Sequence, residues 1–394
     1  MTRLRLCYLF FFMAMASSMP YYAMHYEERG LTGSQTGILI ALPPIMTMVG
    51  APLWTAIADA TRKHKAVTLI TTGGASLGML GIMVTQSFVG LLPVVALYSL
   101  CLAPIMSMLD NVVMARLGER KDDFGRQRVV GTLGPALTGP VVSALVGLVG
   151  LRVPFYAAAA SFAALFVLLA GVTPRVEPLS GTFREEFRTL LRNPLLQRFL
   201  VVVFLGMTGY TAMVTYLYVR MEELGAPMWL FGFGLTVGTL GEIPFLLSSK
   251  RLLSRFGVRA TLLASLIAII VILFGVSLAP TAGIVLALQL LHGTAFSGMV
   301  ISGVAYADGV APPGMGATAQ GIFNAVFGGL ASATGAFLSS VLREQWGSVR
   351  MFRAAGVIAV LGLVLFVINE RRGPREAEVG LAADDRTLLS SGEA

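Results

Sequence analysis

Residues 259–279 read RATLLASLIAIIVILFGVSLA, and after Arg259 no charged side chain interrupts the run. A helix of about 20 apolar residues is long enough to cross the ~30 Å hydrocarbon layer of a bilayer. Comparable runs recur along the chain and predict twelve spans: 4–25, 34–57, 66–86, 90–114, 127–150, 154–172, 197–223, 228–250, 259–279, 283–307, 316–342 and 350–370. We therefore expect an all-α membrane protein with twelve transmembrane helices.

The composition excludes a water-soluble fold. Of the 394 residues, 56% are hydrophobic and 13% are charged, whereas soluble domains carry about 25% charged residues. No loop is long or polar enough for a separate soluble domain, and no phosphate-binding loop is present, so ATP is not expected as the energy source. The two cysteines, Cys7 and Cys101, lie inside apolar runs and predict neither a disulfide nor a metal site.

Lys and Arg are distributed unevenly about these spans. With the N-terminus in the cytoplasm, most of the 29 basic residues fall in cytoplasmic loops and tails, as the positive-inside rule requires. Those on the opposite side are Arg29, Arg152, Arg220, Arg343, Arg350 and Arg353. We therefore expect a multi-pass protein of the cytoplasmic (inner) membrane with both termini cytoplasmic. The net charge of +8 follows from this topology, so nucleic acid is not expected as a partner.

A polar stretch near the middle of the chain divides the spans into two groups of six. Sliding the chain by 195 residues lays Glu27 and Glu28 on Glu222 and Glu223, which indicates a weak parallel repeat. The expected organisation is an N-terminal six-helix bundle at 1–172, a cytoplasmic linker at 173–197, a C-terminal six-helix bundle at 198–370 and a disordered cytoplasmic tail at 371–394.

Several motifs resemble one subgroup of transporters. They are YYAMHYEERGLT at 21–32, APLWTAIAD at 51–59, LDN at 109–111, FGRQRVVGTLG at 124–134, LHG at 291–293 and ATAQG at 317–321. The set resembles the subgroup of the major facilitator superfamily that contains lactose permease, nucleoside–proton symporters and phenylpropionate permeases. The resemblance spans nearly the whole chain and implies two pseudo-symmetric six-helix halves around a central cavity.

Ionisable residues at membrane depth are costly and are candidates for function. Asp110 lies toward the inner end of the fourth span and Arg128 begins the fifth, so the two side chains can pair across the cavity or exchange each other for a solute group. The resemblance to lactose permease implies that this pair contacts the solute, with Asp110 where that permease has Glu. A purely structural salt bridge at the cytoplasmic rim is the alternative.

Glu242 and His292 are the candidates in the second half. Glu242 has no opposite charge nearby in the sequence, and an apolar surrounding disfavours an unpaired carboxylate. This residue is therefore the first candidate for carrying the coupling proton, and Asp110 is the second. His292 matches a coupling-associated histidine of lactose permease, but Ala295 stands where that permease has a Glu. We therefore expect His292 to bind solute without running the same proton relay. The alternative for both residues is a hydrogen bond inside the bundle.

Three residues of the first span are candidates for the outer part of the cavity. Tyr21, Tyr22 and His25 lie close together on one helix and are expected to contact the solute. An aromatic belt at the membrane interface is the alternative.

The loop after the second span resembles the superfamily's Gly-x-x-x-Asp-Arg-x-Gly-Arg motif. It keeps Asp59, Arg62 and Lys63 and loses the glycines. An acid here can meet the positive N-terminal end of the eleventh span, near Gly316, so these residues are expected to gate the cytoplasmic side.

The expected function is secondary active transport of a small organic solute by alternating access. The resemblance implies a sugar, a nucleoside or an aryl acid, moved by proton symport. No cofactor beyond the proton gradient is expected, the partners are the solute, protons and the lipid bilayer, and the expected state is a monomer. The alternative is proton-coupled efflux of drugs or metabolites, which the Gly- and Pro-rich stretch at 131–140 and the 19 methionines favour. Three scattered histidines form no catalytic pattern, so an enzyme is not expected.

Overall fold

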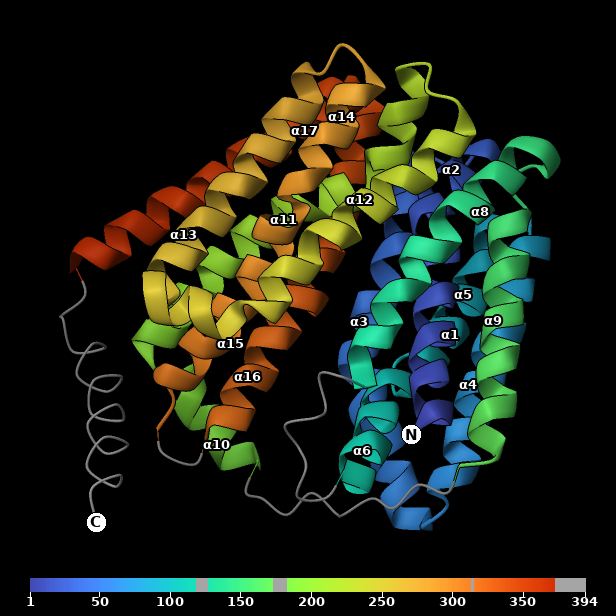
Figure 1. Ribbon diagram of the computed structural model, residues 1–394, viewed down its shortest axis with the longest axis horizontal. Coiled ribbons are helices and arrows are strands. Elements are labelled where there is room, and N and C mark those ends of the chain that lie inside the picture. The colour runs from blue at the N-terminus through green and yellow to red at the C-terminus, as the bar shows by residue number, and fades with distance from the viewer. Residues whose placement is uncertain (118–126, 173–182, 313–314, 373–394) are drawn as a thin grey trace.

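The computed structural model describes residues 1–117, 127–172, 183–312 and 315–372, and within these ranges the chain is helical without strands (Figure 1). The first half consists of α1 (Thr2–Ser18), η1 (Met19–Tyr21), α2 (Tyr22–Glu28), α3 (Gly33–Thr61), α4 (His64–Val84), α5 (Phe88–Leu102), α6 (Ile105–Leu117), η3 (Val129–Thr132), α8 (Leu133–Val149) and α9 (Val153–Ala170). The second half consists of α10 (Phe183–Leu191), α11 (Pro194–Glu223), α12 (Met228–Leu247), α13 (Ser249–Leu278), α14 (Ala282–Leu288), η4 (Gln289–Leu291), η5 (Gly293–Ser297), α15 (Gly298–Gly309), α16 (Gly316–Asn324), η6 (Ala325–Leu330) and α17 (Ala331–Arg372).

Eleven described segments are long and apolar enough to cross a membrane. The last, Thr318–Glu370, has 53 residues, which at 1.5 Å per residue would span roughly 80 Å, far more than one bilayer. Its continuity is broken at Gly347, where φ is 76° and ψ is 168°. A turn at this glycine makes two passes of the segment. The structure thus agrees with the predicted twelve-helix, all-α membrane fold.

Helix ends follow local sequence signals. Thr32 and Gln35 form a capping box at the start of α3, in which each side chain accepts a hydrogen bond from the other residue's backbone N–H, at 3.2 and 3.1 Å. Asn193 caps α11 through Leu195 N–H at 2.9 Å, with Pro194 in the first turn. The last bundle therefore starts at Pro194 instead of the expected 198.

The segment expected as a linker is partly helical. Residues 173–182 lie outside the described part of the chain, and 183–191 form the short α10. Leu190 of α10 is fully buried, and Glu186 accepts a hydrogen bond from Thr318 Oγ1 at 2.5 Å. Most of the expected tail lies outside the described residues, since α17 ends at Arg372.

Each half has its own apolar core. One cluster of buried side chains lies wholly within the first half, from Leu4 to Val172. The other lies in the second half and takes in Tyr21, Ala23, Met24, Val142 and Val146 of the first. Many outward-facing side chains are also apolar, such as Leu148 at 82% exposure, as a lipid-facing surface requires.

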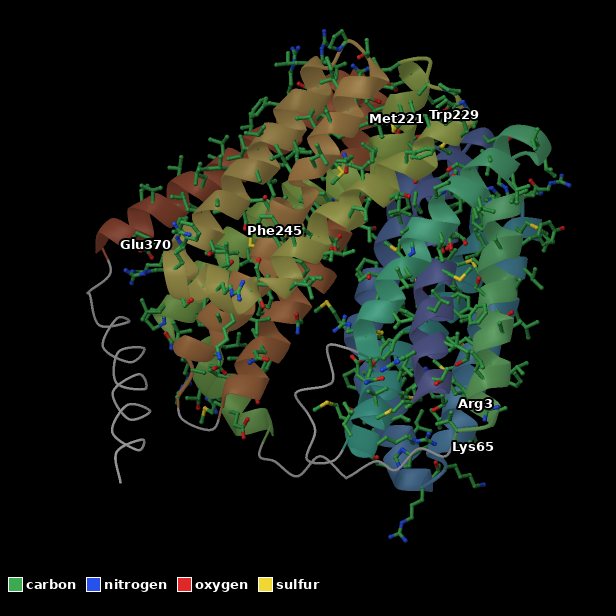
Figure 2. The ribbon with its side chains drawn as sticks, in the orientation of Figure 1. Arg3, Lys65, Met221, Trp229, Phe245 and Glu370 are labelled. Atoms are coloured by element: carbon green, nitrogen blue, oxygen red, sulfur yellow. The ribbon has the colours of Figure 1, made fainter. Side chains whose placement is uncertain are left out.

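The two ends of the bundle differ in charge. Figure 2 shows Arg3 and Lys65 at the lower end, where the chain begins, and Met221 and Trp229 toward the upper end. We call these ends the terminus side and the far side. Arg3 and Lys65 are among the basic residues predicted to face the cytoplasm.

The halves meet closely on the far side. α3 packs against α17, and α8 packs against α12. A Cβ atom on Gly139 would lie 2.8 Å from the carbonyl oxygen of Gly232, so the two helices touch at backbone distance. Thr236 Oγ1 also donates to the carbonyl of Ala136 at 3.3 Å. Figure 1 shows the two halves diverging from this region toward the terminus side.

Candidate functional site

Two adjoining cavities lie between the halves. The smaller has a volume of about 200 Å³ and is lined by Glu242, His292 and Gln289, with apolar residues of α1 opposite them. The larger has a volume of about 370 Å³ and is lined mainly by aromatic and apolar residues of both halves. We call them the carboxylate cavity and the aromatic cavity. Glu242 and His292 are the only acidic or basic side chains among the described residues that line either one.

Glu242, His292 and Tyr210 form a hydrogen-bonded chain. His292 Nε2 lies 2.8 Å from Glu242 Oε1, and His292 Nδ1 lies 2.7 Å from the hydroxyl of Tyr210. The side chains of His292 and Glu242 are 18% and 20% exposed, and Tyr210 is buried. With a proton on Nε2, the imidazole donates to the carboxylate and accepts from the phenol. With the proton on Glu242, the carboxyl donates to Nε2.

Two glycines allow the helical segments that carry Glu242 and His292 to approach each other closely. Gly241 precedes Glu242 on α12, and Gly293 follows His292. A Cβ atom on Gly293 would overlap the backbone of Gly241, so only glycine permits this approach of α12 and η5. A Cβ atom on Gly238, one turn earlier on α12, would lie 3.4 Å from the imidazole ring. The carboxylate of one helix thereby reaches the histidine of another.

This geometry corrects two predictions. Glu242 was expected to be unpaired, but His292 is its partner. His292 was expected to lack a carboxylate because Ala295 occupies the position one turn later, yet α12 supplies the carboxylate instead. The sequence shows directly only the neighbours along one helix, whereas this pair joins residues far apart in the chain. Tyr210 and Gln289 were missed altogether, since a Tyr and a Gln inside an apolar span carry no distinctive signal.

Asp110 and Arg128 lie apart from the cavities. Asp110 Oδ1 accepts a hydrogen bond from the hydroxyl of Tyr8 at 2.6 Å, and within the described residues no ion pair joins Asp110 to Arg128. The Arg128 side chain is exposed. Neither residue lines the two cavities, because both lie close to the terminus side. The contact of this pair with solute stays a prediction.

The three candidates of the first span have different surroundings. Tyr22 lines the aromatic cavity and donates a long hydrogen bond of 3.4 Å to the hydroxyl of Tyr98. Tyr21 is hydrogen-bonded to Ser143 at 2.6 Å and is buried. His25 is 2% exposed, and its ring lies 4.1 Å from the ring of Phe155. Tyr21 and His25 line neither cavity, so in this conformation only Tyr22 is placed to contact a solute.

The expected gate at Asp59 is not closed in this conformation. Asp59 lies 3.6 Å from His64 in its own half, and Arg62 adopts a left-handed conformation at the end of α3, with φ 54°. The end of α16 that Asp59 was expected to meet is occupied by its own half, because Glu186 contacts Thr318 there. Within the described residues, no hydrogen bond or ion pair joins Asp59 to that helix end. The gating role of Asp59, Arg62 and Lys63 stays a prediction.

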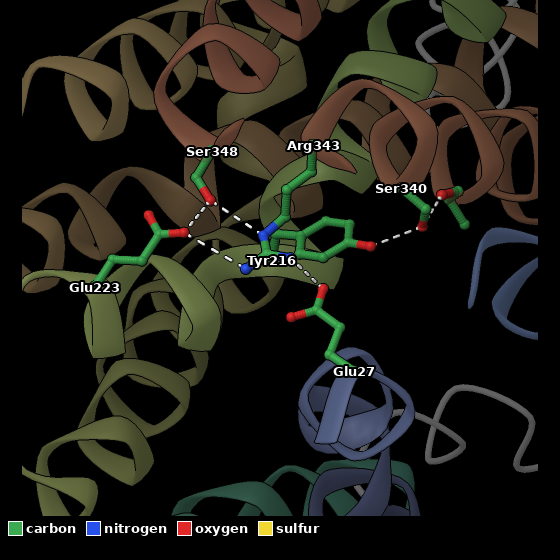
Figure 3. A network of polar contacts seen from close by, with 7 residues as sticks. Glu27, Tyr216, Glu223, Ser340, Arg343 and Ser348 are labelled. Carbon is green, nitrogen blue, oxygen red and sulfur yellow. Dashed lines mark hydrogen bonds and ion pairs between the residues drawn. The ribbon is translucent and has the colours of Figure 1, made fainter. Parts of the chain in front are cut away.

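A polar network closes the far side (Figure 3). Arg343 of α17 forms ion pairs with Glu27 of α2 and with Glu223 of α11, the latter at 3.5 Å. Ser348 donates to Glu223 at 2.6 Å, and the guanidinium of Arg343 lies 5.2 Å from the ring centre of Tyr216. Glu27 comes from the first half and the other residues from the second. We call this set the far-side latch.

The sequence marks both acids of the latch, but it does not show that they lie close together in space. Glu27 and Glu223 belong to the Glu-Glu pairs that the internal repeat had aligned. Arg343 had been counted as an outside charge only. Charges at helix ends are common, and nothing in the sequence shows that one acid from each pair shares the same guanidinium.

The glycines of the stretch 131–140 serve helix packing. A Cβ atom on Gly134 would lie 3.0 Å from the backbone of α1, and Gly139 faces Gly232 across the halves. Pro135 lines the carboxylate cavity. Close packing therefore accounts for these glycines.

Within the described residues no group of three His, Cys, Asp or Glu side chains is placed to hold a metal ion.

A twelve-pass helical protein with cavities between two six-helix halves has the architecture of a major facilitator superfamily transporter. Residues 1–354 match the model of the MFS_1 like family, and the chain belongs to that family.

Curated relatives and solved structures are transporters too. The chain is 28% identical over 381 residues to a maltose permease of Geobacillus stearothermophilus, covering 94% of this chain and 95% of that protein. It is 25% identical over 406 residues to the putative nucleoside transporter YegT of Escherichia coli (strain K12), covering 93% of each. The crystal structure of the nucleoside transporter NupG superposes with a TM-score of 0.84 at 18% identity, covering 94% of this chain and 99% of that one. The similarity to NupG shows the fold, and together these findings show a secondary transporter.

Proposed function

We propose that this protein imports a small hydroxylated solute together with a proton, by alternating access of its two halves. The observation that carries the proposal is the hydrogen-bonded chain of Glu242, His292 and Tyr210. Glu242 and His292 line the carboxylate cavity, and Tyr210 lines the aromatic cavity beside it. A carboxylate and an imidazole offer both acceptors and a donor, which suits hydroxyl groups. The names of the relatives, a maltose permease and a putative nucleoside transporter, support a sugar or a nucleoside.

Of a sugar, a nucleoside and an aryl acid, the aryl acid fits the lining of the cavities least well. Glu242 is the only acidic side chain among the described residues that line either cavity, and neither Lys nor Arg accompanies it there. A carboxylate solute would meet the carboxylate of Glu242 without a permanent cation. Sugars and nucleosides carry no such charge.

Coupling would follow from the shared proton. The pair can take up one proton, on Glu242 or on His292, and hydrogen-bonding solute hydroxyls would then bind the protonated pair better than the unprotonated one. Solute binding would thereby favour proton uptake, so solute and proton would bind together. The far-side latch would hold the protein open to the terminus side, which we propose is the cytoplasmic face of the inner membrane. The solute would then be released inward.

The test is transport by purified protein in proteoliposomes, with radiolabelled maltose and uridine as solutes. Glu242→Gln should abolish the accumulation of solute that a pH gradient drives. It should leave the movement of solute down its own concentration gradient unchanged. Glu28→Gln is the matched control, because Glu28 is exposed and lines neither cavity. Accumulation by Glu242→Gln at the level of the unchanged chain would refute the coupling role.

Efflux is the second candidate function. The observation that favours it is the methionine-rich, apolar lining shared by both cavities, to which Met15 and Met19 contribute. Flexible thioether side chains adapt to varied apolar molecules. A host that overexpresses the protein should then resist a lipophilic cation, and resistance without uptake of either solute would replace the import proposal.

A further inference from the structure

The aromatic cavity has a different chemistry from the carboxylate cavity beside it. Its rings come from both halves: Tyr22 and Tyr98 from the first, and Tyr210, Phe296 and Phe327 from the second. Within the described residues, no acidic or basic side chain lines it. An apolar cavity of about 150 Å³ holds one benzene molecule, so a volume of about 370 Å³ accepts an aryl group of one or two rings.

The hydroxyl groups around this cavity are largely engaged elsewhere. Thr47, Thr211 and Ser332 donate to backbone carbonyls of their own helical segments, at 2.8, 2.8 and 3.2 Å. Tyr22 donates to Tyr98, and the hydroxyl of Tyr210 is bonded to His292. A polyhydroxylated group placed here would leave donors unpaired, at a cost of about 1–3 kcal/mol for each. A flat apolar ring meets no such cost.

The helical geometry opens space at this cavity. Phe296 lies in η5, and Phe327 and Gly328 lie in η6, and both segments are π-helical turns. Such turns are rare, insert an extra residue into a helix and occur frequently at functional sites. Here they place two phenyl rings 5.6 Å apart at the edge of one cavity.

The two cavities adjoin, because Met15, Met19 and Val214 line both. We infer that the transported solute has two unlike ends, a sugar joined to a planar ring, with the sugar in the carboxylate cavity and the ring in the aromatic cavity. Aryl glycosides have this form, and nucleosides are its N-linked variant. The inference rests on the proposed function and narrows its substrate class: a free disaccharide fills only one of the two environments.

The first experiment measures binding to the purified, unchanged protein by calorimetry. The probes are matched pairs: methyl and phenyl β-glucoside, methyl and phenyl β-galactoside, and methyl riboside with uridine. Burying an aromatic ring contributes about 1.5–3 kcal/mol, so the ring-bearing member of whichever pair binds should bind at least about tenfold more tightly. Equal affinities within every pair, or tighter binding of maltose than of any ring-bearing probe, would overturn the inference.

The second experiment fills the aromatic cavity. Gly328 lines it, and a Cβ atom there would meet no atom within 4 Å. Gly328→Leu should therefore fold and should remove most of the tenfold preference for the ring while leaving the affinity for the methyl glycoside. Gly321→Leu is the matched control, because Gly321 also has open space around it and lines neither cavity. The smaller Gly328→Val serves if the leucine variant does not fold.

The outcomes distinguish a failure of this inference from a failure of the proposed function, proton-coupled import. An unchanged ring preference in a folded Gly328 variant overturns the inference, and proton-driven accumulation that is lost in Glu242→Gln still supports transport. Binding of no glycoside or nucleoside, with binding of a lipophilic cation instead, overturns both.

Discussion

The far-side latch predicts how strongly one carboxylate biases the protein toward the conformation seen here. Glu27 is the member of the latch that belongs to the first half (Figure 3). Arg343 keeps Glu223 and Ser348 as partners within its own half. Glu27→Gln therefore removes the ion pair between the halves and leaves the guanidinium paired, so the substitution reports the contribution of the contact itself.

The magnitude follows from the exposure of the pair. A hydrogen bond between charged groups contributes about 1.5–3 kcal/mol. The side chains of Arg343 and Glu27 are 22% and 26% exposed, so water screens part of this, and about 1–2 kcal/mol is a reasonable expectation. The population open to the far side should rise by about 5–30-fold in Glu27→Gln.

The assay measures access to the cavities from the far side. Met15 lines both cavities, so a cysteine introduced by Met15→Cys reacts with a membrane-impermeant thiol reagent when that side opens. Cys7 and Cys101 are buried, and the chain without Met15→Cys gives the background rate. In sealed vesicles with the far side facing the medium, Glu27→Gln should speed labelling by the stated factor.

The control is Glu28→Gln, on the same helix, with an exposed side chain outside the latch. Equal labelling rates for Glu27→Gln and Glu28→Gln, or a Glu27→Gln rate within twofold of the parent, would show that the latch does not set the conformational balance.

Three further predictions concern the packing and the site. Gly232→Ala would overlap the facing backbone of α8 and cost about 1–3 kcal/mol in the state closed on the far side, so far-side labelling should accelerate as it does in the latch variant. Gly347→Ala forces a side chain onto a backbone with φ 76° and should lower the free energy of unfolding by about 1–3 kcal/mol; thermal melting compared with the helical Gly321→Ala checks this, and equal melting temperatures would contradict it. Tyr210→Phe removes the hydroxyl that contacts His292 Nδ1, a loss of about 0.5–1.5 kcal/mol. The half-saturating solute concentration for proton-driven uptake should therefore rise a few-fold. An unchanged concentration would argue against a role for the hydrogen-bonded chain of Glu242, His292 and Tyr210.

Much of the fold follows from the sequence because lipid imposes a simple rule. Every backbone polar group in the hydrocarbon layer must be paired within its own segment, so each long apolar run becomes a helix. The runs located the spans, and the split at Gly347 within one long apolar helix agrees with the predicted boundary between 316–342 and 350–370. The family was recognisable as well, since its motifs lie at helix ends and turns where local sequence decides the conformation.

The sequence also singled out Glu242 and His292, because an ionisable side chain in an apolar run is conspicuous. It did not pair them, and it placed Tyr21 and His25 at a cavity that the structure gives to Tyr22, Tyr98 and residues of the second half. Hydropathy fixes the depth of a residue in the membrane. Which neighbour its side chain meets depends on the rotation of each helix about its axis.

That rotation was decided by the tertiary structure alone. The approach of Gly241 to Gly293 joins the carboxylate to the histidine, and the meeting of the halves at Gly139 and Gly232 brings Glu27 to Arg343. These contacts join residues far apart in the chain, and they form only when small residues let two particular helices touch. The sequence by itself determined which segments enter the membrane and which charges they carry; packing between those segments determined which charges meet.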